Sequence, residues 1–291
     1  MSASSIGPSP VSMPTEHDYE LEVTARAFTM DYSPAAGWHK PQLLPIEQLT
    51  AHPGAAGHHN DQLVIEVLKV CRRMDGTIAA FRPWEHARRF RASARRLAMP
   101  ALPDDLFVSA VDELVEAEAG SLDEAAGSSL CLRSEMFAAD LSLGQGSSQH
   151  YGFVLTAQSA SRAAERSSTD QPDGPNRFVV RATRPRAEVT LLAPDDCASP
   201  GVMAESVLTL ASRLGYIVRQ QRATLHEWRT ASRQGTTETF TCGTLEGVVP
   251  LGDGEPGPVT AAIRQSLLDI QSGREPGPRG WMYQIPSADA S

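Results

Sequence analysis

The stretch "FRPWEHARRFRASARRLAMP", residues 81–100, is rich in arginine and contains no lysine. Its apolar side chains recur every three or four residues, which predicts an amphipathic helix with arginines on its other faces. Just before it, "QLVIEVLKVCRRMDGTIAAF", residues 62–81, has two apolar runs around the pair Asp75-Gly76. This pattern is typical of a β-hairpin. A hairpin followed by an amphipathic helix is therefore the local unit from which the fold is built.

The arginines of this helix do not indicate nucleic-acid binding. The chain has 291 residues, and its 26 basic and 35 acidic side chains give a net charge of -9. Binding through counterion release needs a positive face, which this composition does not favour. Only two of the basic residues are lysines, Lys40 and Lys69. The preference for arginine is thus a property of the whole chain, as a GC-rich bacterial genome produces.

Cysteine usage and hydropathy favour a cytoplasmic protein. Cys71, Cys131, Cys197 and Cys242 form neither a CxxC pair nor a His/Cys metal spacing, so we expect no metal site. No apolar run approaches the roughly 20 residues that a membrane span requires. The opening segment is rich in Ser and Pro and lacks the features of a signal peptide, and residues 1–18 are expected to form a disordered tail.

Strands and helices follow one another irregularly along the chain. The predicted strands are residues 19–32, 128–141, 151–157, 177–182, 188–194, 216–221, 237–243 and 246–251, and the further helices are 103–120, 200–215 and 258–272. Because no regular βαβ alternation is present, we expect an α+β, two-lobed fold. The expected parts are an N-terminal α+β domain at residues 19–157, a linker loop at 158–175 and a C-terminal domain at 176–291.

Several motifs carry a resemblance to a known family. They are "HHNDQLVIEVLKV", "DGTIAAFRPWEHARRFRASARRLAMP", "LCLRSEMF", "SPGVMAESVLTLASRLGYIVRQQ" and "ETFTCGTLEGVVPL". In this order they resemble the branched-chain aminotransferases of the fold-type IV pyridoxal-phosphate family. The resemblance covers about residues 19–285 with one large gap. It implies that family's two-lobed fold with a shortened second, cofactor-binding domain, and a homodimer.

The resemblance also implies a phosphate cup. In that family the arginine at the place of Arg89 binds the cofactor phosphate, and a guanidinium suits such a bidentate oxyanion. Gly243 and Thr244 resemble the second half of the cup, where a backbone N–H and a hydroxyl face the anion. Without the resemblance, these two residues would be an ordinary strand-to-turn junction. The other arginines of the helix are expected to form a solvated surface.

The family holds pyridoxal phosphate on a lysine that is missing from the corresponding interval here. That interval, residues 151–176, is shorter than the family requires and has no lysine. The family's Ile-Thr pair at the next helix is replaced by Val202-Met203. Lys69 matches a family position that does not carry the cofactor. We therefore expect that pyridoxal phosphate is not covalently bound, and that the protein has no cofactor.

Three residues are candidates for chemistry in the remaining pocket. Arg133 matches an arginine on the substrate side of the family's cleft and is expected to bind a carboxylate. Glu135 lies two residues later, on the same face of a strand, and is a candidate general base. The alternative is a structural ion pair between the two. Glu66 matches a carboxylate near the entrance strand; its alternative is a satisfied polar residue of the hairpin.

The remaining candidates lie in loops and at strand ends. His59 is a candidate acid and base and Asn60 a candidate substrate contact, because both stand near the predicted cleft. The alternative for His59 and its neighbour His58 is a surface loop. Tyr151, at the shortened junction, is a weaker substrate contact. Cys242 is either a nucleophile or, as we favour, a small buried residue.

These expectations favour an enzyme independent of pyridoxal phosphate. It would perform acid–base chemistry, namely cyclisation, isomerisation or condensation, on a carboxylated intermediate derived from an amino acid or a keto acid in specialised metabolism. Two alternatives stay open. One is a non-catalytic ligand-binding or regulatory protein, and the other is an aminotransferase that holds pyridoxal phosphate noncovalently.

Overall fold

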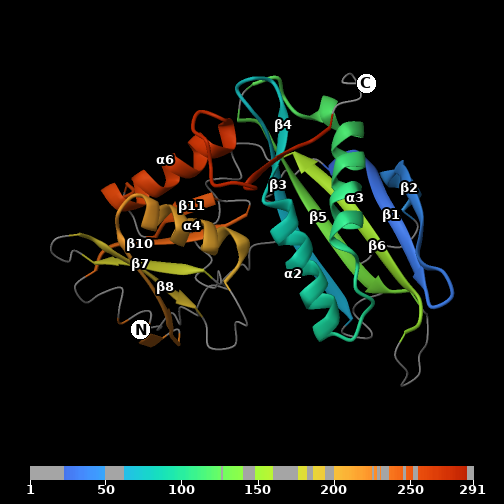
Figure 1. The fold of residues 1–291 in the computed structure, drawn as a ribbon, viewed down its shortest axis with the longest axis horizontal. Coiled ribbons are helices and arrows are strands. Elements are labelled where there is room, and N and C mark those ends of the chain that lie inside the picture. The colour runs from blue at the N-terminus through green and yellow to red at the C-terminus, as the bar shows by residue number, and fades with distance from the viewer. Residues whose placement is uncertain are drawn as a thin grey trace, which may run out of the picture.

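The structure is a computed structural model with two lobes, each built on a β-sheet (Figure 1). It describes residues 23–49, 62–125, 127–139, 148–159, 176–181, 186–193, 200–224, 226–227, 230, 236–244, 247–251 and 255–286. The expectations for His58, His59, Asn60, the tail at residues 1–18 and residues 160–175 of the linker fall outside these ranges. The expected α+β, two-lobed fold is confirmed.

The first lobe contains a seven-stranded sheet in the order β12-β4-β3-β5-β6-β1-β2, with every neighbouring pair antiparallel. Its strands are β1 (Val23–Ser33), β2 (Gly37–Pro45), β3 (Leu63–Arg72), β4 (Ile78–Phe81), β5 (Ser129–Ala138), β6 (Tyr151–Ser159) and β12 (Met282–Gln284). The segment that follows α6, red in Figure 1, crosses from the second lobe to place β12 beside β4. The last strand therefore joins the two lobes.

The hairpin and the helix of the quoted stretch form as expected. In the β3–β4 turn, Asp75 Oδ1 accepts hydrogen bonds from the N–H of Thr77 (3.0 Å) and from its hydroxyl (2.6 Å). These bonds lower the pKa of Asp75. Gly76 has φ +81°, a conformation that glycine adopts without a Cβ clash. The turn thus leads directly into β4 and the helix α2 (Pro83–Arg96).

Helices α2 and α3 (Asp104–Ala117) cover one face of the seven-stranded sheet (Figure 1). Phe90 of α2 and Phe107 of α3 are fully buried, and their ring centroids lie 5.4 Å apart. Burial of one such side chain contributes about 1.5–3 kcal/mol. Side chains alternate along a strand, so Leu132 and Met136 of β5 enter this core while Arg133 and Glu135 point to the other face. Two 3-10 turns, Ile46–Gln48 and Ala119–Ser121, follow β2 and α3.

The second lobe contains a five-stranded sheet in the order β11-β10-β7-β8-β9. Its elements are β7 (Arg177–Arg181), β8 (Glu188–Ala193), α4 (Val202–Arg213), β9 (Ile217–Arg222), β10 (Thr236–Gly243), β11 (Gly247–Pro250) and α6 (Pro258–Ser272). Phe178 and Phe240 stack at the centre of its core, 4.7 Å between centroids. Thr224 and Glu227 form a capping box, because Thr224 N–H donates to Glu227 and Glu227 N–H donates to the Thr224 hydroxyl. No helix of the described chain is long and apolar enough to cross a bilayer.

Candidate functional site

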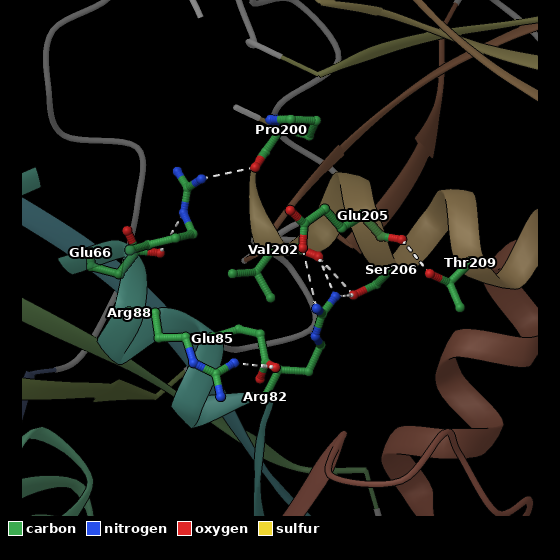
Figure 2. A network of polar contacts seen from close by, with 10 residues as sticks. Glu66, Arg82, Glu85, Arg88, Pro200, Val202, Glu205, Ser206 and Thr209 are labelled. Atoms are coloured by element: carbon green, nitrogen blue, oxygen red, sulfur yellow. Dashed lines mark hydrogen bonds and ion pairs between the residues drawn. The ribbon is translucent and has the colours of Figure 1, made fainter. Parts of the chain in front are cut away.

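Two arginines, Arg82 at the N-cap of α2 and Arg89 within α2, reach the start of α4 in the other lobe. Figure 2 shows Arg82 in this position. Arg89 Nη1 donates to the carbonyl of Pro200 at 2.9 Å. Arg82 Nη1 donates to the carbonyl of Val202 at 3.1 Å and to Ser206 Oγ at 2.7 Å. Pro200 and Val202 stand on either side of Gly201, the N-cap of α4. Two guanidinium groups therefore lie against the first turn of this helix.

Positive groups and two carboxylates lie together at this helix start. The N-terminus of a helix carries partial positive charge on its unpaired N–H groups, and no side chain caps α4. The two arginines add positive charge at the same place. Glu205 lies 3.3 Å from Arg82 Nη2, and Glu66 lies 3.6 Å from Arg89 Nε. A phosphate at the first turn would accept from the helix N–H groups and from Arg89, a favourable arrangement.

Glu66 lies between Arg89 and the buried His86 and contacts both. His86 is 2% exposed, and its Nδ1 lies 2.8 Å from Glu66 Oε1. The same Glu66 oxygen is the one that faces Arg89 Nε. Glu66 therefore contacts both His86 and Arg89, the arginine that the resemblance implies as a phosphate ligand. Sequence reasoning did not single out His86, although its position three residues before Arg89 places both on one face of the helix.

The end of β10 is linked to the start of α4 through Asn176. The Asn176 carbonyl accepts from Cys242 N–H at 3.2 Å and from Thr241 Oγ1 at 2.9 Å. A Cβ added at Gly201 would come within 3.3 Å of Asn176 Nδ2, so the two residues are packed closely. Gly243 closes the β10–β11 pairing, and the next residue is Thr244. The expected second half of the cup thus follows a strand end that is linked to the start of α4.

Cys242 occupies the core of the second lobe. It is 4% exposed and packs in the same cluster as Phe240. This position agrees with the small buried residue that the sequence favoured. No group of three or more His, Cys, Asp or Glu side chains in the described part of the chain is arranged to hold a metal ion.

The other candidates lie away from α4. Arg133 Nε donates to Glu135 Oε1, so these two form an ion pair on the sheet face that points away from α2 and α3. Tyr151 is 4% exposed and belongs to the core on the opposite face, where its hydroxyl donates to the Ser148 carbonyl at 2.8 Å. The structure therefore brings Arg89 and Glu66 together and keeps this ion pair separate from Tyr151. The roles of these residues stay predictions.

Solved structures with a similar fold define the class of protein to which this fold belongs. No protein-family model matches the chain. Among solved structures, the fold is similar to the branched-chain amino acid aminotransferase from Thermobaculum terrenum in its PLP holo form (TM-score 0.66, 17% identity, 90% of this chain and 100% of that one). It is equally similar to the T.th. enzyme with pyridoxamine 5'-phosphate (TM-score 0.66, 20% identity, 91% and 100%). The fold is thus that of fold-type IV branched-chain aminotransferases.

Sequence relatives then give the family. The chain is 30% identical to the probable branched-chain-amino-acid aminotransferase of Streptomyces coelicolor, over 90% of this chain and 91% of that protein. It is 27% identical to the branched-chain-amino-acid aminotransferase of Mycolicibacterium smegmatis, over 90% of each. The chain belongs to the branched-chain-amino-acid aminotransferase family.

These findings correct the functional expectation drawn from the sequence. An enzyme independent of pyridoxal phosphate, a non-catalytic pseudo-aminotransferase and a chain without a cofactor are all wrong, because the relatives are aminotransferases and the solved neighbours include pyridoxal- and pyridoxamine-phosphate forms. The error lay in equating a missing lysine with a missing cofactor. Arginine side chains and helix N–H groups can bind a phosphate, and this binding does not require a lysine. Arg89 lies at the start of α4, where such N–H groups are present.

Proposed function

We propose that this protein binds pyridoxal phosphate and transfers an amino group between an amino acid and a keto acid, as the names of its relatives indicate. The observation that carries the proposal is a pair of arginines, Arg82 at the N-cap of α2 and Arg89 within it, at the uncapped start of α4. When bound, the cofactor supplies the electron sink that this chemistry requires. The protein supplies binding, orientation and the proton-carrying groups.

The phosphate would be held by Arg89 and by the backbone N–H groups of Val202 and Met203 in the first turn of α4. Gly243 N–H and the Thr244 hydroxyl complete the proposed cup from the end of β10. A phosphate near neutral pH carries between one and two negative charges, which offset the helix end and the arginines. Replacement of the family's Ile-Thr by Val202-Met203 removes a hydroxyl but leaves both N–H groups. The residues present therefore fit a phosphate.

The finer part of the proposal is that the cofactor is held without a covalent link to a lysine. The chain has two lysines. Lys40 is exposed on β2, 3.6 Å from Asp31, and Lys69 is buried on β3 opposite Cys131. The alignment with the Streptomyces coelicolor relative extends over 334 positions, more than the 291 residues of this chain, so that relative has residues without a counterpart here. This supports the loss of the lysine-bearing interval.

The substrate side of the proposal uses the outer face of the seven-stranded sheet. Arg133 has a side chain 43% exposed, so its terminal nitrogens can bind a substrate carboxylate while Nε stays on Glu135. Glu135, 12% exposed at its side chain, keeps this guanidinium in place through the ion pair. We expect the protein to be a homodimer, as in the family it resembles, and sedimentation velocity tests that expectation.

The test is cofactor binding followed by a half-reaction. Titration calorimetry with pyridoxal phosphate and pyridoxamine phosphate is expected to show saturable binding of both. Protein loaded with pyridoxal phosphate and mixed with leucine, isoleucine or valine is expected to yield pyridoxamine phosphate and the keto acid, detected by chromatography. Absence of binding by both cofactor forms would refute the proposal.

Attachment is tested separately. Loaded protein is treated with borohydride, digested and analysed by mass spectrometry. We expect the peptides of Lys40 and Lys69 to be free of a pyridoxyl group. A pyridoxyl group on either lysine would overturn the noncovalent part of the proposal and leave cofactor dependence intact.

A further inference from the structure

Arg82 adopts a backbone conformation that arginine rarely takes. It is the N-cap of α2 with φ +50° and ψ +46°, in the left-handed region. For a residue with a Cβ this conformation costs about 1–2 kcal/mol. Its N–H donates to the Trp281 carbonyl at 2.7 Å, and its carbonyl accepts from the N–H groups of Glu85 and His86. A glycine would adopt this conformation without strain, so what arginine adds here is its side chain.

The Arg82 side chain is buried and fixes the first turn of α4 (Figure 2). Nη1 donates to the Val202 carbonyl and to Ser206 Oγ, and Nη2 lies 3.3 Å from Glu205 Oε2. Ser206, fully buried, donates its own hydroxyl proton to the same Val202 carbonyl at 2.7 Å. The guanidinium also lies over the Trp281 indole, 5.2 Å from its centroid. The Arg82 side chain thus contacts three acceptors in the first turn of α4.

The anion-binding arginine stands on the same helix as Arg82. Arg82 and Arg89 are seven residues apart, two helical turns or about 10 Å along α2. Helix α2 is packed on the first sheet through Phe90, so it behaves as a rigid support for both guanidinium groups. The contact of Arg82 with Val202 therefore also sets how far the α4 N–H groups lie from Arg89.

We infer that Arg82 is a positioning residue of the phosphate site: it fixes the first turn of α4 so that the Val202 and Met203 N–H groups and Arg89 converge on one anion. This inference rests on the proposed function. The alternative role is a tether that joins the two lobes and nothing more. The two roles differ in what a substitution changes. A tether affects stability alone, whereas a positioning residue changes how much the phosphate adds to ligand affinity.

The test compares two ligands that differ in the phosphate alone, pyridoxamine phosphate and pyridoxamine. The dissociation constants of both are measured by calorimetry, and their ratio reports the contribution of the phosphate. Arg82→Lys keeps the charge, but a single ammonium cannot bond the Val202, Ser206 and Glu205 acceptors in the same fork geometry. We expect the ratio to fall about tenfold, equivalent to about 1.4 kcal/mol. The phosphorus NMR shift of the bound ligand is expected to move as well.

Two further variants make the result decisive. Ser206→Ala removes one acceptor of Arg82, changes little volume, and is expected to lower the ratio about threefold. Arg88→Met is the matched control, because Arg88 is an exposed arginine of the same helix, paired with Glu85. It is expected to leave the ratio unchanged. If Arg82→Lys does not fold, Ser206→Ala decides the question.

The outcomes separate the inference from the function on which it rests. An unchanged ratio in Arg82→Lys and Ser206→Ala, with wild-type protein still preferring the phosphorylated ligand, would show a tether and overturn the inference alone. Wild-type protein that binds neither ligand, or binds both equally, would refute the proposed phosphate site and the inference with it. A lower ratio in both variants and not in Arg88→Met supports the positioning role.

Discussion

At the scale of single residues, Arg89 makes a contact that its neighbours on α2 do not make. Arg88 pairs with Glu85 on the same helix, and Arg91 pairs with Asp104 at the start of α3. Arg89 alone among these three contacts the segment that precedes α4 in the second lobe. The arginine-rich stretch thus serves one interlobe site and two local ion pairs.

Replacement of Arg89 tests its proposed role in binding the phosphate. Arg89→Met is expected to weaken binding of pyridoxamine phosphate about 10- to 100-fold, because hydrogen bonds to charged groups contribute about 1.5–3 kcal/mol. Calorimetric titration measures the change. Arg91→Met is the control and is expected to bind normally. Equal affinities in both variants would place the phosphate elsewhere.

Glu66 is expected to matter for stability through His86. Glu66→Ala leaves the buried Nδ1 of His86 without its carboxylate acceptor, which costs about 1–3 kcal/mol of unfolding free energy. Urea denaturation measures this loss. Glu85→Ala, which breaks the exposed pair with Arg88, should change stability by less than about 0.5 kcal/mol. A Glu66→Ala protein as stable as the wild type would argue against this buried pair.

The resemblance singles out Arg89, and its role stays a prediction, whereas no sequence pattern indicates Arg82 or His86. A buried arginine cannot be told from a surface arginine by pattern, because its burial depends on contacts such as that of Arg82 with Val202, 120 residues away. His86 falls on the buried side of the predicted helix, beside Phe90. Its charge partner Glu66 lies on a different strand, so pattern alone could not pair them.

At the scale of elements, the structure confirms the hairpin, both N-terminal helices and the strand and helix pattern of the second lobe. Strands β2 and β12 were not predicted. Strand β2 is an edge strand with two prolines and no buried side chain, so it lacks alternation. Strand β12 has three residues and exists because β4 offers it a pairing edge. Both depend on tertiary contacts that a local pattern does not contain.

The attachment of β12 is expected to depend on pH. Tyr283 OH donates to Asp112 Oδ2 of α3 at 2.9 Å. Burial, and then this bond, raises the pKa of Tyr283 from 10.0 to about 12. Because the folded pKa is the higher one, the contribution is fully present below pH 10 and is lost as the pH rises from 10 through 12. Thermal melts from pH 8 to 12 should show this loss in wild-type protein.

Tyr283→Phe is the matched variant for that measurement. It cannot ionise and cannot donate to Asp112, so it is expected to be about 1 kcal/mol less stable near neutral pH. The stability difference between the two proteins should shrink between pH 10 and 12. A difference that stays constant over this range would contradict the role of the Tyr283 hydroxyl.

At the scale of the whole molecule, the two lobes are joined by contacts from several elements. Besides the bond from Arg89 to Pro200, they include the β12–β4 pairing, the Arg82 side chain, and the hydrogen bond from Met74 N–H to the Ser272 carbonyl. We therefore expect both lobes to unfold in one transition, with equal calorimetric and van't Hoff enthalpies. Scanning calorimetry measures both, and two separated transitions would contradict this coupling.

The function predicted from the sequence for the whole molecule is wrong. The motifs identified the family and the two-lobed fold. The further prediction, that a chain without a lysine after Lys69 has no cofactor, is wrong. Physically, a lysine attaches a cofactor, whereas charge and N–H donors hold its phosphate, and we propose Arg89 and the start of α4 for that role.

The most direct test of the proposed phosphate site is a crystal structure of the protein with pyridoxamine phosphate. We expect phosphate oxygens within hydrogen-bond distance of the Arg89 guanidinium and of the N–H groups of Val202 and Met203. A phosphate bound away from the start of α4, or crystals that take up no ligand, would contradict it.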